Sequence, residues 1–176
     1  MNKYLALSFI GKDRPGIVAA VSKALFDAGC NLEESTMTKL RNEFAIILIV
    51  KLGTSCSLNS FKKIIETTAK KNALSVSVRD ISKEPVNTKT QKGKKYIITV
   101  YGADKPGIVY ATSAYLAKNK FNITDVQTTL SAKVYVMFIE ILLPIAKEKK
   151  LLADISKVAK KLGVTISAHQ AEEPEL

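Results

Sequence analysis

An eight-residue motif occurs twice in this chain, 91 residues apart. Residues 11–18 read Gly-Lys-Asp-Arg-Pro-Gly-Ile-Val, and residues 102–109 read Gly-Ala-Asp-Lys-Pro-Gly-Ile-Val. The same offset aligns Asn31 with Asn122 without a gap. Self-similarity at a fixed offset is the signature of a duplicated structural unit. The 176 residues are therefore expected to form two related units rather than a single domain.

Each unit contains the same order of predicted elements: strand, helix, strand, strand, helix, strand. In the first unit, alternating large and small side chains over 4–10 predict a strand, after which the Pro-Gly pair opens a helix. Apolar residues from Ile17 to Leu25 recur at helical spacing, and Gly29 is a typical residue beyond a helix end. Lys120 replaces this glycine in the second unit, so that helix is expected to end differently. Strands are predicted over 4–10, 31–40, 44–52, 74–81, 96–101, 122–131, 134–143 and 164–170, hairpin turns at 41–43 and 132–133, and second helices over 58–69 and 151–162.

This order of elements predicts an α+β fold. The chain is expected to contain two tandem ferredoxin-like units of βαββαβ order, each an antiparallel sheet with both helices on one face. In that topology the first and third strands are central, and the polar second strand forms an edge. The third strand is apolar on both faces, so one set of its side chains points away from the helices and is expected to contact another chain or the other half. These side chains are Ile47, Ile49, Val136 and Phe138.

The repeat and the charge distribution predict the domain boundaries. Residues 1–82 and 96–171 are expected to form the two units, 83–95 a lysine-rich linker and 172–176 an acidic C-terminal tail. The net charge is +11, and the linker alone carries five lysines and one glutamate. A lysine-rich segment of this kind is typical of a solvated connection between domains.

The positive charge leaves direct nucleic-acid binding as an alternative. Only three arginines are present, Arg14, Arg41 and Arg79, and lysine is a weaker sign of specific phosphate recognition than arginine. No zinc-finger, helix-turn-helix or RNA-recognition motif accompanies them. Nucleic acid is therefore disfavoured as a direct partner.

Composition and cysteine content restrict the other classes of protein. The hydrophobic fraction of 47% is ordinary for a folded globular protein. The longest apolar run, 44–50, is far too short for a membrane span, and the first residues lack a signal-peptide pattern, so a cytoplasmic protein is expected. Cys30 and Cys56 lack the spacing of a metal site or a disulfide pair, and His169 is the only histidine. No metal or other cofactor is expected.

The sequence gives little support to an enzyme. It contains no Gly-x-Ser-x-Gly motif, no phosphate-binding P-loop and no metal-binding motif. His169 is expected to be an ordinary strand residue. The two motif carboxylates stand at equivalent positions of the two copies, as expected for two binding sites rather than for a catalytic pair.

The repeated motif has the chemistry to hold a small zwitterion. Asp13 or Asp104 can pair with an ammonium group. Backbone N–H groups at 16–18 or 107–109 can bind a carboxylate, because they lie at the positive end of a predicted helix.

A purely structural role is the alternative for each of these residues. Asp13 also suits the cap of a helix N-terminus. Pro15 and Gly16 suit the first turn of a helix, and Asn31 suits a left-handed turn after that helix.

The sequence Asp-Arg-Pro-Gly-Ile-Val after an initial strand, with Asn31 opening the next strand, resembles the ACT domain. The resemblance covers almost the whole chain as two copies, a layout similar to the glycine cleavage system transcriptional repressor type. In ACT domains that bind amino acids, the ligand lies between two units, held by the loop before the first helix and the start of the second strand. Glycine occupies positions 11 and 102, where some of these domains carry a polar side chain. Carried over by position, the resemblance implies ligand contacts from Gly11, Asp13, Pro15, Gly16, Ile17 and Asn31, and from Gly102, Asp104, Pro106, Gly107, Ile108 and Asn122.

The resemblance also implies a function. It suggests a non-enzymatic regulatory protein that binds a small amino acid at the interface of ACT units, with glycine or serine as first candidates, in a homo-oligomer. It further implies a partner protein, which by analogy with the repressor type is a transcription factor. A regulatory subunit of an amino-acid biosynthetic enzyme is the alternative.

Overall fold

The computed structural model describes residues 3–54, 56–83 and 93–171, which fall into two compact units. The first unit holds the described residues up to 83, and the second unit holds those from 93 onward. Most of the predicted linker and the whole predicted acidic tail lie outside the described residues. No helix in the described ranges is long and apolar enough to cross a membrane.

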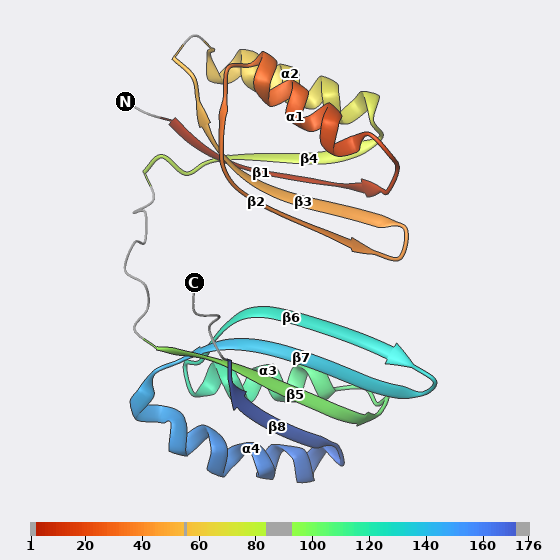
Figure 1. Ribbon diagram of the computed structural model, residues 1–176, viewed down its shortest axis with the longest axis vertical. Coiled ribbons are helices and arrows are strands. Elements are labelled where there is room, and N and C mark those ends of the chain that lie inside the picture. Colours follow the sequence, from red (N-terminus) through yellow and green to blue (C-terminus); the bar gives the residue numbers. More distant parts are fainter. Residues whose placement is uncertain (1–2, 55, 84–92, 172–176) are drawn as a thin grey trace. The chain divides into compact units, whose positions relative to one another are not determined.

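Each unit is a four-stranded antiparallel sheet with two helices on one face (Figure 1). The strand order is β2-β3-β1-β4 in the first unit and β6-β7-β5-β8 in the second, so the first and third strands of each repeat are central. Both the α+β fold and the central strands predicted from the sequence are confirmed. The first unit consists of β1 (Lys3–Lys12), α1 (Ile17–Asp27), β2 (Asn31–Leu40), β3 (Glu43–Leu52), α2 (Leu58–Lys71) and β4 (Leu74–Asp80). The second consists of β5 (Lys94–Ala103), α3 (Ile108–Lys118), β6 (Asn122–Ser131), β7 (Val134–Leu143), a short 3-10 turn (Ile145–Lys147), α4 (Glu148–Leu162) and β8 (Thr165–Gln170).

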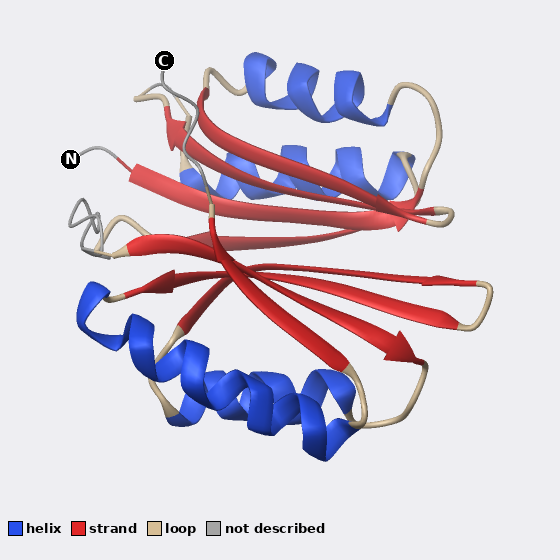
Figure 2. Cartoon of the chain, turned by 60° about the horizontal axis from the view of Figure 1, so that its bottom comes forward, coloured by secondary structure: helices blue, strands red, loops and turns tan. Residues whose placement is uncertain are grey.

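The core of each unit lies between its sheet and its own helices (Figure 2). Side chains along β3 alternate between the core and the opposite face, as the period of a strand requires. The open face carries Ile47, 52% exposed, and Phe138 of β7, 46% exposed, while Ile49 and Val136 are half-buried there. The predicted orientation of these four residues is confirmed. The largest fully buried side chains include Phe9, Phe61, Ile65, Ile98, Ile139 and Leu151.

Residues in the left-handed backbone region form the tight connections. Gly29 (φ 64°) ends α1 as predicted. Lys120 (φ 57°) occupies the equivalent position after α3, so the expectation that this helix ends differently is wrong. Helix α3 ends in the same left-handed geometry as α1, and Lys120 adopts this geometry at a strain that glycine would avoid. In the hairpins, Arg41 (φ 55°) and the pair Ala132 and Lys133 (φ 47° and 71°) make the turns.

A polar contact joins the start of β5 to the start of α4 in the second unit. The hydroxyl of Tyr96, which is 3% exposed, donates a hydrogen bond to the Glu148 carboxylate. This bond, reinforced by burial and by the nearby negative charge, raises the pKa of Tyr96 to about 12. This hydrogen bond therefore connects helix α4 to the sheet as long as the Tyr96 hydroxyl is protonated.

We expect the second unit to lose stability in alkali through Tyr96. The pKa of an unfolded tyrosine is about 10. Because the folded pKa is higher, at about 12, this stabilisation is complete below pH 10 and is lost as the pH rises through 12. Tyr96→Phe should lower the free energy of unfolding at pH 7 by about 1–2 kcal/mol. It should also flatten the decline between pH 10 and 12, as measured by urea unfolding; an equally steep decline in this variant would contradict the assignment.

Candidate functional site

The repeated motif forms the loop between the first strand and the first helix of each unit. Gly16 (φ 90°) and Gly107 (φ 94°) occupy the cap positions of α1 and α3, and neither cap is made by a side chain. The interpretation of Asp13 as the helix cap is therefore wrong. The left-handed conformation at this position requires glycine, and it places the first N–H groups of each helix at the loop without intrahelical partners.

The remaining loop residues separate into exposed and buried groups. Pro15 and Pro106 are exposed, in the turn that precedes each helix. Ile17 and Ile108 are each 2% exposed and belong to the cores of their units. Their side chains are therefore unavailable to a ligand, and only their backbone N–H groups remain as candidates for contact.

Close packing explains why the last residue but one of β1 and of β5 is glycine. A Cβ atom on Gly11 would lie 2.8 Å from Leu74 Cδ2 and 2.9 Å from the Ala73 carbonyl oxygen. A Cβ atom on Gly102 would lie 2.9 Å from Val164 Cγ1. A polar side chain at either place would collide with the start of the last strand. These two glycines thus shape the loop but offer no side-chain contact.

The two motif aspartates have different surroundings. Asp13 Oδ2 lies 2.5 Å from Nζ of Lys39 on the edge strand β2. The equivalent of Lys39 in the second unit is Leu130, and no described lysine or arginine forms an ion pair with Asp104. Instead, burial and, secondarily, the negative charge of Asp104 raise the pKa of the half-buried Tyr135. The repeat preserves the carboxylate but not its neighbour.

The asparagines lie at the far end of the sheet from the loops. Asn31 of β2 and Tyr4 of β1 both pair with Lys51 of β3. The loop follows Gly11, which lies seven residues further along β1. At about 3.3 Å per residue this separation is roughly 23 Å. The second unit repeats the separation between Asn122 and Gly102. Within one unit, therefore, the structure does not bring the two halves of the predicted site together.

Hydrogen bonding also distinguishes the asparagines. The Asn31 side-chain amide donates to Glu33 Oε1 at 2.9 Å. Thr124 stands at the position of Glu33 in the second unit, and its hydroxyl donates to Glu140. The Asn122 side chain makes no hydrogen bond to any described residue. Asn31 lies in the extended strand β2, so its interpretation as a left-handed turn residue is wrong.

The basic residue inside each motif has a structural role that the sequence did not reveal. Arg14 Nη2 donates to Asn72 Oδ1 at 2.8 Å, at the C-terminal end of α2. In the second unit Lys105 Nζ lies close to Gly163, at the C-terminal end of α4. A positive charge beside the last helical carbonyls is favourable. A basic residue stands at the same position of both repeats, and this was the sequence signal that could have indicated the role.

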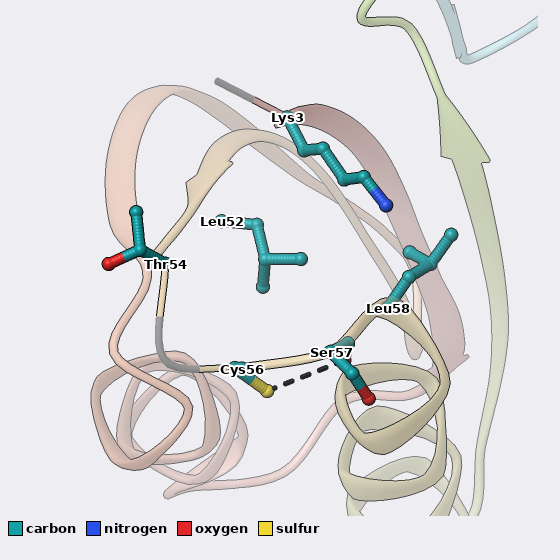
Figure 3. A pocket seen from close by; sticks show the side chains of 7 residues that line it. Lys3, Leu52, Thr54, Cys56, Ser57 and Leu58 are labelled. Carbon is teal, nitrogen blue, oxygen red and sulfur yellow. Dashed lines mark hydrogen bonds between the residues drawn. The ribbon is translucent and has the colours of Figure 1, made fainter. Parts of the chain in front are cut away.

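A hollow of about 330 Å³ opens at the other end of the first unit (Figure 3). It is lined by residues that include Lys3, Thr54 and Cys56, and none of the predicted site residues takes part. Cys30 lies nearby. Burial raises the pKa of its thiol, a hydrogen bond with the Gly53 backbone partly offsets this rise, and the charge of Cys56 adds to it. Both cysteines are free thiols that pack against the core. The fold brings them near each other although their sequence spacing gave no such indication.

Comparisons with curated proteins identify relatives of this chain. An ACT-domain family model matches residues 3–79 and again residues 94–169. The glycine cleavage system transcriptional repressor of Escherichia coli (strain K12) is 26% identical over 122 residues, which are 69% of this chain and 62% of the repressor. The chain thus spans less than two thirds of the length of that relative. A UPF0237 protein of Clostridium acetobutylicum is 35% identical over 74 residues, 41% of this chain and 83% of that protein.

Solved structures cover the chain more fully. A protein from Galdieria sulphuraria, described only as unknown, has a TM-score of 0.81 and 27% identity, covering 98% of this chain and 100% of that chain. A structure described as a candidate glycine cleavage system transcriptional repressor has a TM-score of 0.70 and 18% identity over 98% of this chain and 99% of that chain, which shows a shared fold. Because the family model matches nearly all of both units, this chain belongs to the ACT-domain family and carries the domain twice.

Proposed function

We propose that this protein is a non-enzymatic regulator that binds a small amino acid at a junction of two ACT units and signals its presence to a partner protein. The observation that carries the proposal is the duplicated loop, in which an exposed carboxylate precedes a helix whose N-terminus is capped by no side chain of the described residues. Similarity to the glycine cleavage system transcriptional repressor supports regulation of transcription through the partner. Glycine and serine are the first ligands to test, and the cytoplasm is the expected location.

The chemistry of the loop matches an α-amino acid. A carboxylate can accept hydrogen bonds from the ligand's ammonium group. The N–H groups at the start of a helix, together with its positive end, favour the ligand's carboxylate. The asparagine that opens the second strand can both donate and accept, but it lies roughly 23 Å away within its own unit. A ligand that contacts both must therefore meet the loop of one ACT unit and the asparagine of another.

Two other functions make different predictions. A regulatory subunit of a biosynthetic enzyme would co-purify with a larger catalytic chain from native lysate. A direct nucleic-acid binder would lose affinity steeply with salt, because each phosphate contact releases about one counterion. The net charge of +11 is the observation that keeps this second alternative open.

A thermal-shift screen of the proteinogenic amino acids tests the proposal. A ligand at ten times its dissociation constant should stabilise the folded state by about 1.4 kcal/mol, which raises the melting temperature by several degrees. Asp13→Ala combined with Asp104→Ala should keep the fold, since both residues are exposed, and should abolish the shift. If every amino acid at millimolar concentration leaves the wild-type melting temperature unchanged, the ligand proposal fails.

A further inference from the structure

The two ACT units are not equivalent as binding sites. Resting on the function proposed above, we infer that the second unit supplies the recognition groups for the amino acid, whereas the first unit satisfies the same groups internally. Two separate contacts carry this inference, one at each end of the sheet. Both involve residues that differ between the repeats although the recognition residue itself is kept.

The first contact concerns the aspartate. The Lys39 ammonium group lies 2.5 Å from Asp13, where the ammonium group of an amino acid would have to bind. Lys39 thus acts as a tethered substitute for the ligand. In the second unit the position holds Leu130, and no described cation forms an ion pair with Asp104. Of the two motif aspartates, only Asp104 can therefore take a ligand ammonium group without displacing one of the described side chains.

The second contact concerns the asparagine. Asn31 donates its side-chain amide to Glu33, whereas Asn122 makes no hydrogen bond within the described part of the chain. Glu33 is replaced by Thr124, whose hydroxyl is directed to Glu140 instead. The asparagine therefore shows the same difference as the aspartate: among the described residues it has a hydrogen-bond partner in the first unit and none in the second.

The second unit also carries an additional polar group beside its loop. Tyr135 pairs with Gly102 across the sheet, and its hydroxyl contacts Met137 Sδ at 3.7 Å and also interacts with the Thr128 side chain. The first unit has the buried Phe44 at this place. A phenol hydroxyl near Asp104 can donate to a ligand carboxylate, which Phe44 cannot.

Displacing the internal partners weakens binding to the first unit. A half-exposed ion pair and one exposed side-chain hydrogen bond together lower the affinity of a competing ligand by roughly tenfold. Glycine or L-serine should therefore bind the full chain with about one site per chain at concentrations that saturate the second unit. The first unit should respond only at concentrations about ten times higher.

Calorimetric titration of the full chain with glycine and with L-serine tests the inference. Asp104→Asn should weaken binding about tenfold or more, whereas Asp13→Asn should change the affinity by less than twofold. Asp27→Asn, which removes another exposed carboxylate paired with a lysine, is the charge-matched control. Circular dichroism verifies that each variant is folded.

An exchange of neighbours between the units makes the test reciprocal. Leu130→Lys should weaken binding at the second unit about tenfold by placing a lysine beside Asp104. Lys39→Leu combined with Glu33→Thr should raise the stoichiometry from about one to about two per chain. Two equal sites in the wild type, or equal losses in Asp13→Asn and Asp104→Asn, would overturn the inference while leaving the proposed function standing. Absence of binding by any amino acid would overturn both.

Discussion

Gly53→Ala should destabilise the first unit by about 3 kcal/mol and leave the second unit unaffected. A Cβ atom at this position would lie 2.3 Å from the carbonyl oxygen of Gly29. Neither side of this contact can yield easily, because both are backbone: the turn after α1 packs on the loop that leads into α2. For a unit of this size the loss corresponds to a fall in melting temperature of the order of 10 °C or more.

Hydrogen exchange read by mass spectrometry measures this effect unit by unit. Peptides from 3–83 should exchange faster in Gly53→Ala, whereas peptides from 93–171 should keep wild-type protection. Thr54→Ala, an exposed change in the same loop, serves as the control and should stay within about 0.5 kcal/mol of the wild type. Uniform loss of protection in both ranges would contradict the prediction that the effect stays within the first unit.

Most of the fold follows from local sequence patterns. The strand alternation of β3 and the helical spacing from Ile17 determine which face of each element is buried, and the repeat allows each unit to support the interpretation of the other. The left-handed conformation of Gly29 was predictable, because glycine adopts it at little cost. The same conformation at Lys120 was not, because a lysine does not itself favour the left-handed region.

The site was less predictable, because its details depend on contacts between strands. Motif position alone could not show that Lys39 faces Asp13, since this depends on the register of β2. Nor could it show that Asn31 lies at the opposite end of the sheet from its own loop. An aspartate before a helix suggested a cap on statistical grounds, whereas the left-handed Gly16 takes the cap position in the structure.

The two ends of the predicted site in the second unit lie too far apart for one small ligand to contact both within a single copy. Because Asn122 lies roughly 23 Å from the loop of its own unit, a ligand bound by both Asp104 and Asn122 requires two copies of the second unit. We expect Asp104→Ala and Asn122→Ala each to weaken binding of glycine or L-serine about tenfold or more. In a symmetric dimer, each site combines the loop of one copy with the asparagine of the other.

Mixing the two variants decides how the site is assembled. After subunit exchange, half of the dimers contain one copy of each variant, and one of the two sites in such a dimer has both its aspartate and its asparagine. The equimolar mixture should therefore recover about one quarter of the wild-type binding capacity at wild-type affinity, as measured by calorimetric titration. The unmixed variants, and a mixture of Asp104→Ala with Asp104→Asn, should recover none. Failure of the first mixture despite verified exchange would mean that Asp104 and Asn122 do not serve one ligand across two copies, and that the asparagine acts elsewhere.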